Sequence, residues 1–175
     1  KTIKIDPDQK TPITEMSFLP QTLSVLKSKG FEFMTPVQSQ SYDLVYSGDD
    51  VVARSRTGTG KTFAFGIPLI EKIVRSGDMD KPSSRRGGSP LVLVLEPTRE
   101  LAIQVTQELS SVSAQYGMRV QTIYGGASFE MQANAIRNGA HILVATPGRM
   151  LDHISRGTVD LASIKHIVLD EGDTM

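Results

Sequence analysis

The chain lacks cysteine and tryptophan, carries no net charge and contains no long hydrophobic run. The absence of cysteine excludes disulfides, thiolate catalysis and cysteine-based zinc sites. Lys plus Arg and Asp plus Glu both number 19, so no overall basic field attracts nucleic acid, and any polyanion must be recognised locally. No apolar run approaches the ~20 residues that a bilayer span needs, and the first residues lack the apolar core of a signal peptide. We therefore expect a soluble, intracellular domain without membrane association.

The length of 175 residues suits one domain of ordinary size. Short β-rich runs alternate with longer helical patterns, which is typical of an α/β fold: a parallel sheet with helices on both faces. The helical patterns cover residues 20–30, 35–46, 61–75, 99–116, 128–138 and 147–156, and the strand candidates are 51–53, 91–95, 119–124, 141–145 and 166–170. Runs 91–95 and 166–170 are nearly all aliphatic, which predicts that they are the central strands.

A polar motif follows every predicted strand. Because the carboxyl ends of parallel strands lie at one edge of a sheet, where open α/β folds bind their ligands, these motifs are expected to form a single site. They occupy residues 56–62, 97–102, 125–126, 146–149 and 170–173. The intervening stretch 76–90, rich in Gly, Ser and Pro, is expected to be a surface loop.

Residues 55–62, SRTGTGKT, match a phosphate-binding loop except that Ser55 stands where glycine is usual. Glycines let the backbone amides face phosphate oxygens at a helix N-terminus, while Lys61 reaches the β and γ phosphates and the Thr62 hydroxyl is offered to Mg2+. The expected nucleotide contacts in this loop are Arg56, Thr57, Gly58, Thr59, Gly60, Lys61 and Thr62.

The pair Asp170-Glu171, at the end of an aliphatic run, is the expected second half of this site. Asp170 can hold Mg2+, largely through water, and Glu171 can orient or deprotonate an attacking water. An isolated acidic pair is more often a helix cap or a solvated turn, but its pairing with a phosphate-binding loop favours hydrolysis of a nucleoside triphosphate. Lys61, Asp170 and Glu171 are therefore the candidate catalytic residues.

The choice of base cannot be read from these two motifs. No guanine-reading NKxD string occurs. The side-chain amide of Gln38 has one donor and one acceptor face, which match the N6 and N7 edge of adenine, although such a residue is usually an ordinary exposed amide.

Six motifs in order resemble those of the DEAD-box RNA helicases. They are GFEFMTPVQ (30–38), SRTGTGKT (55–62), PTRELA (97–102), GG (125–126), TPGR (146–149) and DEGD (170–173). The runs YSGDDVVARSRTGTGKTFAFGIPLIEKI and VLDEGD further resemble the nucleolar RNA helicase II, or Gu, group. The resemblance implies a RecA-like domain whose core is 49–175, preceded by a Q-motif region, 1–48, that belongs to the same domain.

This resemblance implies an ATP-dependent RNA helicase with ATP and Mg2+ as cofactors and a role in ribosome biogenesis. It suggests a location in the nucleus or nucleolus, with the cytoplasm or an organelle as alternatives. Gln38 would hydrogen-bond adenine, Phe31 would pack near the base, and Asp173 would link motif II to RNA-dependent activation. RNA would be held through its backbone, independently of sequence, by Thr98, Arg99, Gly126, Thr146, Gly148 and Arg149. Plain N-capping is the structural alternative for the two threonines.

The chain departs from the family pattern at a few positions. Met34 and Ile13 stand where a proline and an adenine-stacking aromatic are usual, Ser55 and Arg56 replace Ala and Gln, and Gly172 replaces the Ala of motif II. All the direct nucleotide ligands remain, so hydrolysis is expected to survive.

Motif III and a second RecA-like domain, the expected intramolecular partner, would follow Met175. The chain is therefore expected to be a piece of a longer protein and nearly inactive alone. In such sheets the motif III strand lies between strands 51–53 and 167–170, so either residues after Met175 or another segment of the chain is expected to fill that slot. An RNA clamp or chaperone, an ATPase-dead RNA-binding scaffold and a DNA helicase remain alternatives.

Overall fold

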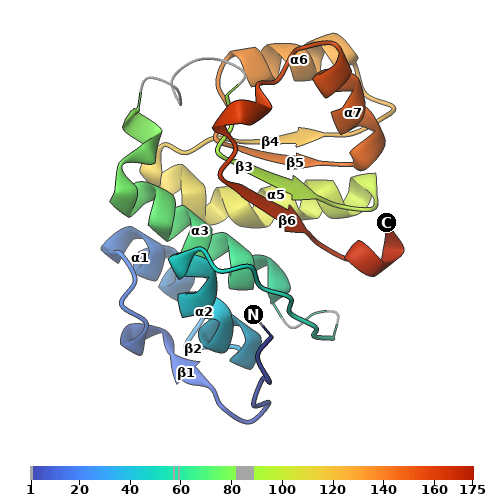
Figure 1. The fold of residues 1–175 in the computed structure, drawn as a ribbon. Coiled ribbons are helices and arrows are strands. Elements are labelled where there is room, and N and C mark those ends of the chain that lie inside the picture. The colour runs from blue at the N-terminus through green and yellow to red at the C-terminus, as the bar shows by residue number, and fades with distance from the viewer. Residues whose placement is uncertain (1, 57, 59, 82–88) are drawn as a thin grey trace. The chain divides into compact units, whose positions relative to one another are not determined.

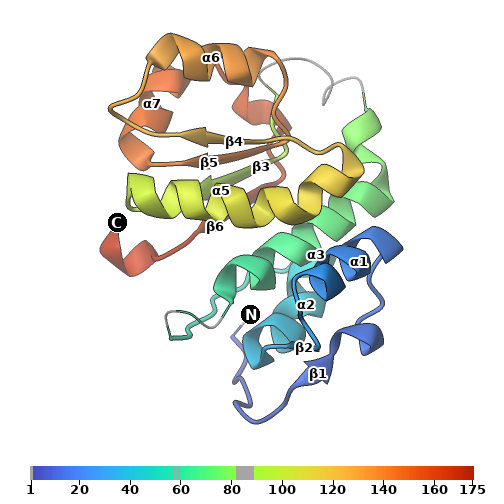
Figure 2. The ribbon, with the colours of Figure 1, turned by 180° about the vertical axis from the view of Figure 1, so that it is seen from behind.

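The computed structural model describes residues 2–56, 58, 60–81 and 89–175. The contacts divide the chain into two compact units, Lys1–Ser76 and Gly77–Met175, which are described separately below. The division at 48/49 between a Q-motif region and a core stays a sequence prediction. Figures 1 and 2 show the chain from opposite sides.

The N-terminal unit contains helices α1 (Pro20–Ser28), α2 (Pro36–Ser47) and α3 (Lys61–Ser76) and a small antiparallel pair, β1 (Thr11–Pro12) with β2 (Phe33–Met34). These three helices confirm the helical patterns expected in this part of the chain. α2 begins with a capping box: the Thr35 side chain accepts from the Gln38 backbone N–H, and the Gln38 side chain accepts from the Thr35 backbone N–H. Gly48 ends α2 in the left-handed conformation, with φ 88°.

A buried carboxyl group on α3 accepts a hydrogen bond from the backbone at the start of α1. Glu71 is fully buried, and its Oε1 accepts from the Leu19 backbone N–H at 2.9 Å. Arg75, one turn later, lies 3.5 Å from the other oxygen of Glu71 and donates to the Ser17 carbonyl at 2.6 Å. Burial, together with the charge of Glu71, raises the pKa of Tyr42, which packs in the same cluster, to about 12. The segment before the Q motif is therefore tied to the helix that follows the phosphate-binding loop.

The C-terminal unit is a parallel four-stranded sheet in the order β4-β5-β3-β6. Its strands are β3 (Val92–Leu95), β4 (Val120–Ile123), β5 (Ile142–Ala145) and β6 (His166–Leu169). Helix α5 (Arg99–Ser113) covers one face, and α6 (Phe129–Arg137) and α7 (Pro147–Ser155) lie on the other, as Figures 1 and 2 show. Short 3-10 turns lie at 13–15, 78–80, 114–116, 161–163 and 172–174. The predicted α/β fold with helices on both faces of a parallel sheet is confirmed.

Two details of the strand prediction are wrong. Residues 51–53 form no strand; within the described residues Val52 makes only an isolated bridge to Thr2. A strand forms when its backbone N–H and C=O groups pair with those of a neighbouring strand over several residues, and here the pairing seen among the described residues is limited to this single bridge. The predicted central strand 166–170 is instead the edge strand β6, with Ile167 and Leu169 largely exposed, while the inner strands are β3 and the fully buried β5.

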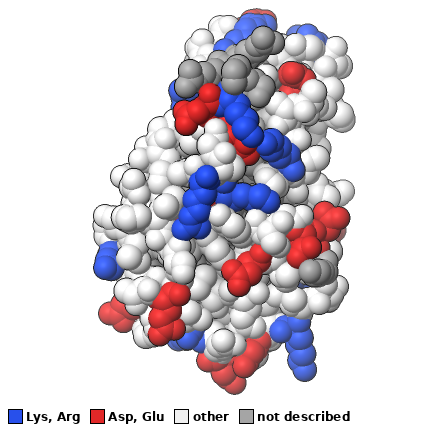
Figure 3. Space-filling model, turned by 60° about the vertical axis from the view of Figure 1, so that its left-hand side comes forward, with Lys and Arg blue, Asp and Glu red and all other residues white. Residues whose placement is uncertain are grey.

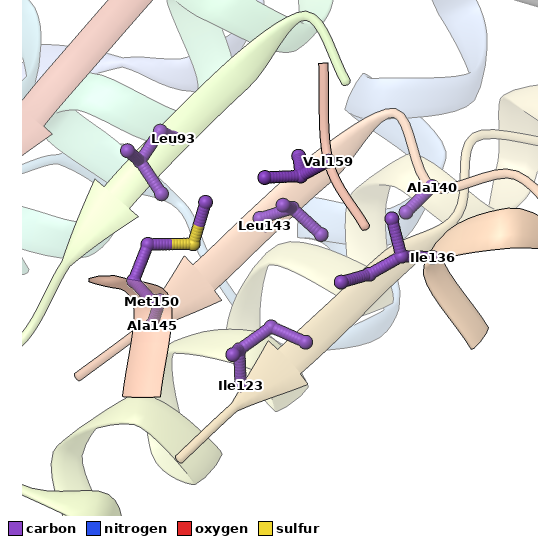
Figure 4. Close-up of a cluster of buried hydrophobic side chains, with 8 residues drawn as sticks. All are labelled: Leu93, Ile123, Ile136, Ala140, Leu143, Ala145, Met150 and Val159. Carbon is purple, nitrogen blue, oxygen red and sulfur yellow. The ribbon is translucent and has the colours of Figure 1, made fainter. Parts of the chain in front are cut away.

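The core of the C-terminal unit lies between the sheet and helices α6 and α7. Figure 4 shows its buried side chains, which come from three strands, both helices and adjoining loops: Leu93, Ile123, Ile136, Ala140, Leu143, Ala145, Met150 and Val159. On the opposite face α5 buries Val105, Leu109 and Val112. Because β3 and β5 bury alternate residues on both faces of the sheet, their register is fixed, and so is the position of the segments that leave their carboxyl ends.

Candidate functional site

Gln38 joins the Q motif to the phosphate-binding loop. Its side chain is 1% exposed, its Oε1 accepts from the Thr35 backbone N–H at 2.9 Å, and its Nε2 donates to the Gly60 carbonyl at 3.0 Å. Both faces of the amide are thus occupied by protein. A contact with adenine would replace these bonds or share their atoms, so the predicted role of Gln38 stays a prediction.

Two glycines of the phosphate-binding loop adopt the left-handed backbone conformation, which glycine takes up without strain. Gly58 and Gly60 have φ of +80° and +81°, and a Cβ on Gly60 would lie 2.2 Å from Gln38 Nε2. Lys61 and Thr62 begin helix α3, where backbone N–H groups and the helix dipole favour phosphate. Thr57 and Thr59 lie outside the described residues.

Other residues around the Q motif are placed as follows. Phe31 packs edge-to-face against Phe63 of α3, with ring centroids 5.9 Å apart, and Ile13 is buried. A mostly apolar hollow of about 500 Å³ lies beside the motif; its lining residues are Ile5, Pro7, Thr35, Pro36, Val37, Ser55 and Arg56. Arg56 at the head of the loop therefore borders a space next to the Q motif.

Four predicted motifs meet at one edge of the C-terminal unit. β3 pairs with β5 through Leu95 and Ala145, and with β6 through Leu95 and Leu169. β4 pairs with β5 through Ile123 and Ala145. One or two residues after these strand ends, the four predicted motifs begin: 97–102, 125–126, 146–149 and 170–173. For these four motifs the structure confirms the predicted convergence.

Three helices of nine residues or more begin at this edge. Thr98 caps α5 by accepting from the Leu101 N–H at 3.2 Å, and Ser128 caps α6 by accepting from the Met131 N–H at 3.3 Å. Thr146 stands at the N-cap of α7 but its side chain makes no capping bond. The capping interpretation therefore fits Thr98 and does not fit Thr146. Helix N-termini present N–H groups and partial positive charge, which suit phosphate oxygens.

The predicted RNA contacts differ in accessibility. Thr98, Arg99, Gly126 and Gly148 are exposed, and Arg99 lies over the ring of Tyr124 at 5.8 Å. The Arg149 side chain is only 15% exposed; its Nη1 donates to the Ala127 carbonyl at 2.8 Å and to Gln132 Oε1 at 3.2 Å. Arg149 thus serves the protein's own structure as well as any contact with RNA.

On one face of the molecule, the basic side chains can be compared with the acidic ones. On the face drawn in Figure 3, Lys and Arg stand among Asp and Glu. This distribution agrees with the zero net charge and leaves recognition of a polyanion to local groups.

Motif II follows β6 directly. The Asp170 backbone N–H donates to the Leu95 carbonyl at 3.1 Å, which continues the ladder by one residue. Glu171 has φ +52° and is the only non-glycine residue with positive φ in the part of the chain that the structure describes. A Cβ on Gly172 would meet only Leu169 Cβ, at 3.8 Å, so the alanine of the family pattern would fit without strain. The DEGD variant therefore changes neither carboxylate.

Glu96 is a functional candidate that the sequence analysis missed. It follows β3 and lies between Thr146 and Asp170 in the register of the sheet. Its side chain is 0% exposed, and its carboxyl group interacts with that of Asp170 through a side-chain hydrogen bond. Burial, reinforced by the neighbouring Asp170 and Glu171, raises the pKa of Glu96 to about 9. No motif marks this residue, because its burial depends on the strands on both sides.

The described residues contain no group of three or more His, Asp or Glu side chains placed to hold a metal ion by themselves. Mg2+ commonly binds through one or two carboxylates together with phosphates and water. Nor, within the described ranges, does any helix combine the length and apolar character that a membrane crossing needs.

Residues 35–175 match the DEAD/DEAH box helicase family. The chain is 45% identical to mouse ATP-dependent RNA helicase DDX50 over 93% of its length, and 46% identical to rat nucleolar RNA helicase 2 over 94%. It is 40% identical to the DEAD-box ATP-dependent RNA helicase CshA of Geobacillus kaustophilus over 94% of its length. These matches cover 21%, 20% and 33% of the relatives, so the chain spans a fifth to a third of their length.

The fold is similar to the crystal structure of a DEAD box protein from the hyperthermophile Methanococcus jannaschii. The TM-score is 0.80 at 39% identity, over 94% of this chain and 42% of that one. The RecA-like fold expected from the motifs is thereby confirmed. With the family pattern matched over residues 35–175 and its motifs placed at the strand ends and helix starts described above, the chain belongs to the DEAD/DEAH box helicase family.

Proposed function

We propose that the protein containing this chain is an ATP-dependent RNA helicase, and that the chain supplies its ATP-binding N-terminal domain and part of its RNA track. The observation that carries the proposal is the order of the motifs: Q motif, phosphate-binding loop and four strand-end segments, in a chain whose residues 35–175 match the helicase family. The printed names of the relatives, ATP-dependent or nucleolar RNA helicases, support the same substrate.

ATP would be held from the N-terminal unit. Gln38 would recognise adenine, with Phe31 packing near the base, and Lys61 would bind the β and γ phosphates. The remaining contacts would come from the loop: Arg56, Thr57, Gly58, Thr59, Gly60 and Thr62. The placement of Lys61 and Thr62 at the start of α3 supports this assignment.

The residues present fit a magnesium ion. Thr62 and Asp170 carry hard oxygen donors, the ligand type that Mg2+ prefers. When bound, Mg2+ neutralises charge on the phosphates. Asp170 would hold it largely through water, while Glu171 would orient and deprotonate the water that attacks the γ phosphate.

RNA would bind through its backbone at the edge where α5, α6 and α7 begin. Thr98, Arg99, Gly126, Thr146, Gly148 and Arg149 would contribute N–H groups, hydroxyls and cations, which position a strand without reading its sequence. A second RecA-like domain of the same protein would close on ATP and RNA. The names of the relatives suggest a nucleolar location and a role in ribosome biogenesis.

The experiment that tests this function is ATP hydrolysis by the full-length protein with and without single-stranded RNA, alongside separation of a short RNA duplex. We expect RNA to raise kcat for ATP and duplex separation to require ATP. Hydrolysis that is equally fast without RNA would contradict the proposal. Stimulation by DNA equal to that by RNA would favour a DNA helicase.

Replacing Gln38 by alanine in the full-length protein is expected to reduce the preference for ATP over GTP. One good bidentate contact to a base provides ~1–3 kcal/mol of discrimination, so the ratio of kcat/KM values should fall about tenfold or more. Gln40→Ala is the matched control, because it removes an amide from the same helix whose hydrogen bonds, among the described residues, go only to the backbone of Asp6. Equal use of ATP and GTP by the unaltered protein would show that Gln38 does not select adenine.

A further inference from the structure

Gln132 on α6 links the turn that contains the glycine pair to the start of α7. The residue is 7% exposed. Its Nε2 donates to the carbonyl of Tyr124, directly before Gly125, at 2.9 Å. Its Oε1 lies 3.2 Å from Arg149 Nη1 and 3.3 Å from His153 Nε2. One buried side chain of α6 therefore contacts both the turn at Tyr124 and helix α7.

Only one orientation of this amide satisfies both the Arg149 guanidinium and the Tyr124 carbonyl. Arg149 can only donate and the Tyr124 carbonyl can only accept, so Oε1 must face the guanidinium and Nε2 the carbonyl. His153 Nε2 lies 3.3 Å from Gln132 Oε1, and its Nδ1 lies 2.7 Å from the Thr158 hydroxyl, which donates to the His153 carbonyl at 3.0 Å. The ring of Phe129 stacks on that of His153 with centroids 4.2 Å apart. The chain of hydrogen bonds is complete only with Gln at position 132.

The turn held by this network has little packing of its own. Gly125 and Gly126 have no side chains, Gly126 has φ +87°, and a Cβ built on Gly125 would meet nothing within 4 Å. The turn is anchored on both sides of the glycine pair: Gln132 binds the Tyr124 carbonyl before it, and Arg149 binds the Ala127 carbonyl after it at 2.8 Å. The two anchoring side chains are themselves hydrogen-bonded. Their loss would leave the turn free to sample other conformations.

We propose that Gln132 is a positioning residue for RNA, which holds the glycine turn 124–128 and Arg149 at the start of α7 as one preformed surface. Gln132 itself does not contact RNA; it acts through the Tyr124 carbonyl and the Arg149 guanidinium. The inference rests on the proposed RNA track. A preformed track avoids the entropy cost of ordering a glycine turn when RNA binds.

The test uses the full-length protein with Gln132→Leu, which keeps the size of the side chain and removes its hydrogen bonds. We expect the Kd for labelled single-stranded RNA, measured with a non-hydrolysable ATP analogue, to rise about tenfold. The RNA concentration that half-saturates ATP turnover should rise equally, while kcat at saturating RNA and KM for ATP stay unchanged. A purely structural role would lower kcat and ATP affinity as well.

Gln132→Glu is the graded variant, because its carboxylate still accepts from Arg149 but cannot donate to the Tyr124 carbonyl. We expect an intermediate loss of RNA affinity, and this variant carries the test if Gln132→Leu does not fold. Gln104→Leu is the matched control and should keep the RNA affinity of the unaltered protein. Gln104 lies on the exposed side of α5, and in the part of the chain that the structure describes its amide binds only Glu108.

Hydrogen exchange without RNA separates this inference from the proposed function. Amides of residues 124–128 should exchange faster in Gln132→Leu than in the unaltered protein. Unchanged exchange, or a folded Gln132→Leu protein with unchanged RNA affinity, overturns the inference. If the unaltered protein binds no RNA, the proposed function and the RNA role of Gln132 fall together, while faster exchange would still show that Gln132 holds the turn.

Discussion

Replacing Glu171 by glutamine in the full-length protein is expected to abolish RNA-stimulated ATP turnover while ATP and RNA binding persist. Glutamine has nearly the same shape but cannot accept the proton of the attacking water. Positioned general bases contribute ~10²- to 10⁴-fold to a rate, so kcat should fall by at least about 100-fold. The variant should keep the local backbone, because Glu171 takes its left-handed φ of +52° from the turn between β6 and the residues 172–174.

Three measurements on each protein check this expectation: ATP turnover at saturating RNA, Kd for a fluorescent ATP analogue, and Kd for RNA with that analogue. Glu130→Gln is the matched control, since Glu130 is an exposed carboxylate in the first turn of α6 that pairs with Arg137 at 3.7 Å. Hydrolysis that continues unchanged in Glu171→Gln would remove Glu171 from the catalytic role.

Replacing Glu96 by glutamine should stabilise the protein against unfolding. The carboxyl group of Glu96 is fully buried beside Asp170 and keeps its proton in the folded protein, whereas the unfolded chain releases this proton above about pH 4.5, which costs stability near pH 8. Glutamine keeps the size of the side chain, carries no charge, and can donate an N–H bond to the neighbouring Asp170 carboxylate. We expect a gain in the free energy of unfolding on the order of 2 kcal/mol near pH 8.

The pH dependence gives this prediction its sign. The pKa of Glu96 is raised from 4.5 to about 9, so the folded protein keeps a proton that the unfolded chain has released. The contribution of Glu96 therefore lowers the free energy of unfolding as the pH rises from about 4.5 towards about 9. Buried His141 and His153 act in the opposite direction: burial lowers their pKa values from 6.5, so their contribution to stability is lost as the pH falls below that value.

Denaturant midpoints of the full-length protein at pH 6.5 and 8.5 separate these contributions. The denaturant midpoint of Glu96→Gln should exceed that of the unaltered protein by more at pH 8.5 than at pH 6.5. Glu130→Gln, which removes an exposed carboxylate, should have the same denaturant midpoint as the unaltered protein at both pH values. A lower midpoint for Glu96→Gln at pH 8.5 would mean that the buried carboxyl group is compensated in the folded protein.

The elements that local signals determine were predictable from the sequence. The Gly-Lys-Thr run marks the start of α3, Thr35 and Pro36 mark the start of α2, and aliphatic runs mark the strands of the C-terminal sheet. These features depend on residues that are close together in the sequence. The meeting of the four strand-end motifs at one edge was also predictable, because the alternation of strands and helices in the sequence predicts a parallel sheet, and the carboxyl ends of parallel strands lie at one edge.

The properties that depend on distant neighbours were not predictable. The aliphatic run at 166–169 favours a central strand, but its place in the sheet depends on which strands pair with it. Glu96 looks like the polar end of a strand, and only β5 and β6 on either side account for its burial. Gln132 looks like a polar helix residue until the turn at 124–128 and the start of α7 are packed beside it.

The three helix starts at the edge of the C-terminal sheet have a consequence for how RNA affinity depends on ionic strength. Neutral N–H groups, hydroxyls and glycine backbone make up most of the proposed track, and Arg99 and Arg149 are its only cations. Each cation that neutralises a phosphate of single-stranded nucleic acid contributes about −0.7 to the slope of log K against log salt. This domain therefore contributes a slope of only about −1.4, so its affinity for RNA should fall about fivefold between ~50 and ~150 mM salt, far less than for a protein with six or more phosphate contacts.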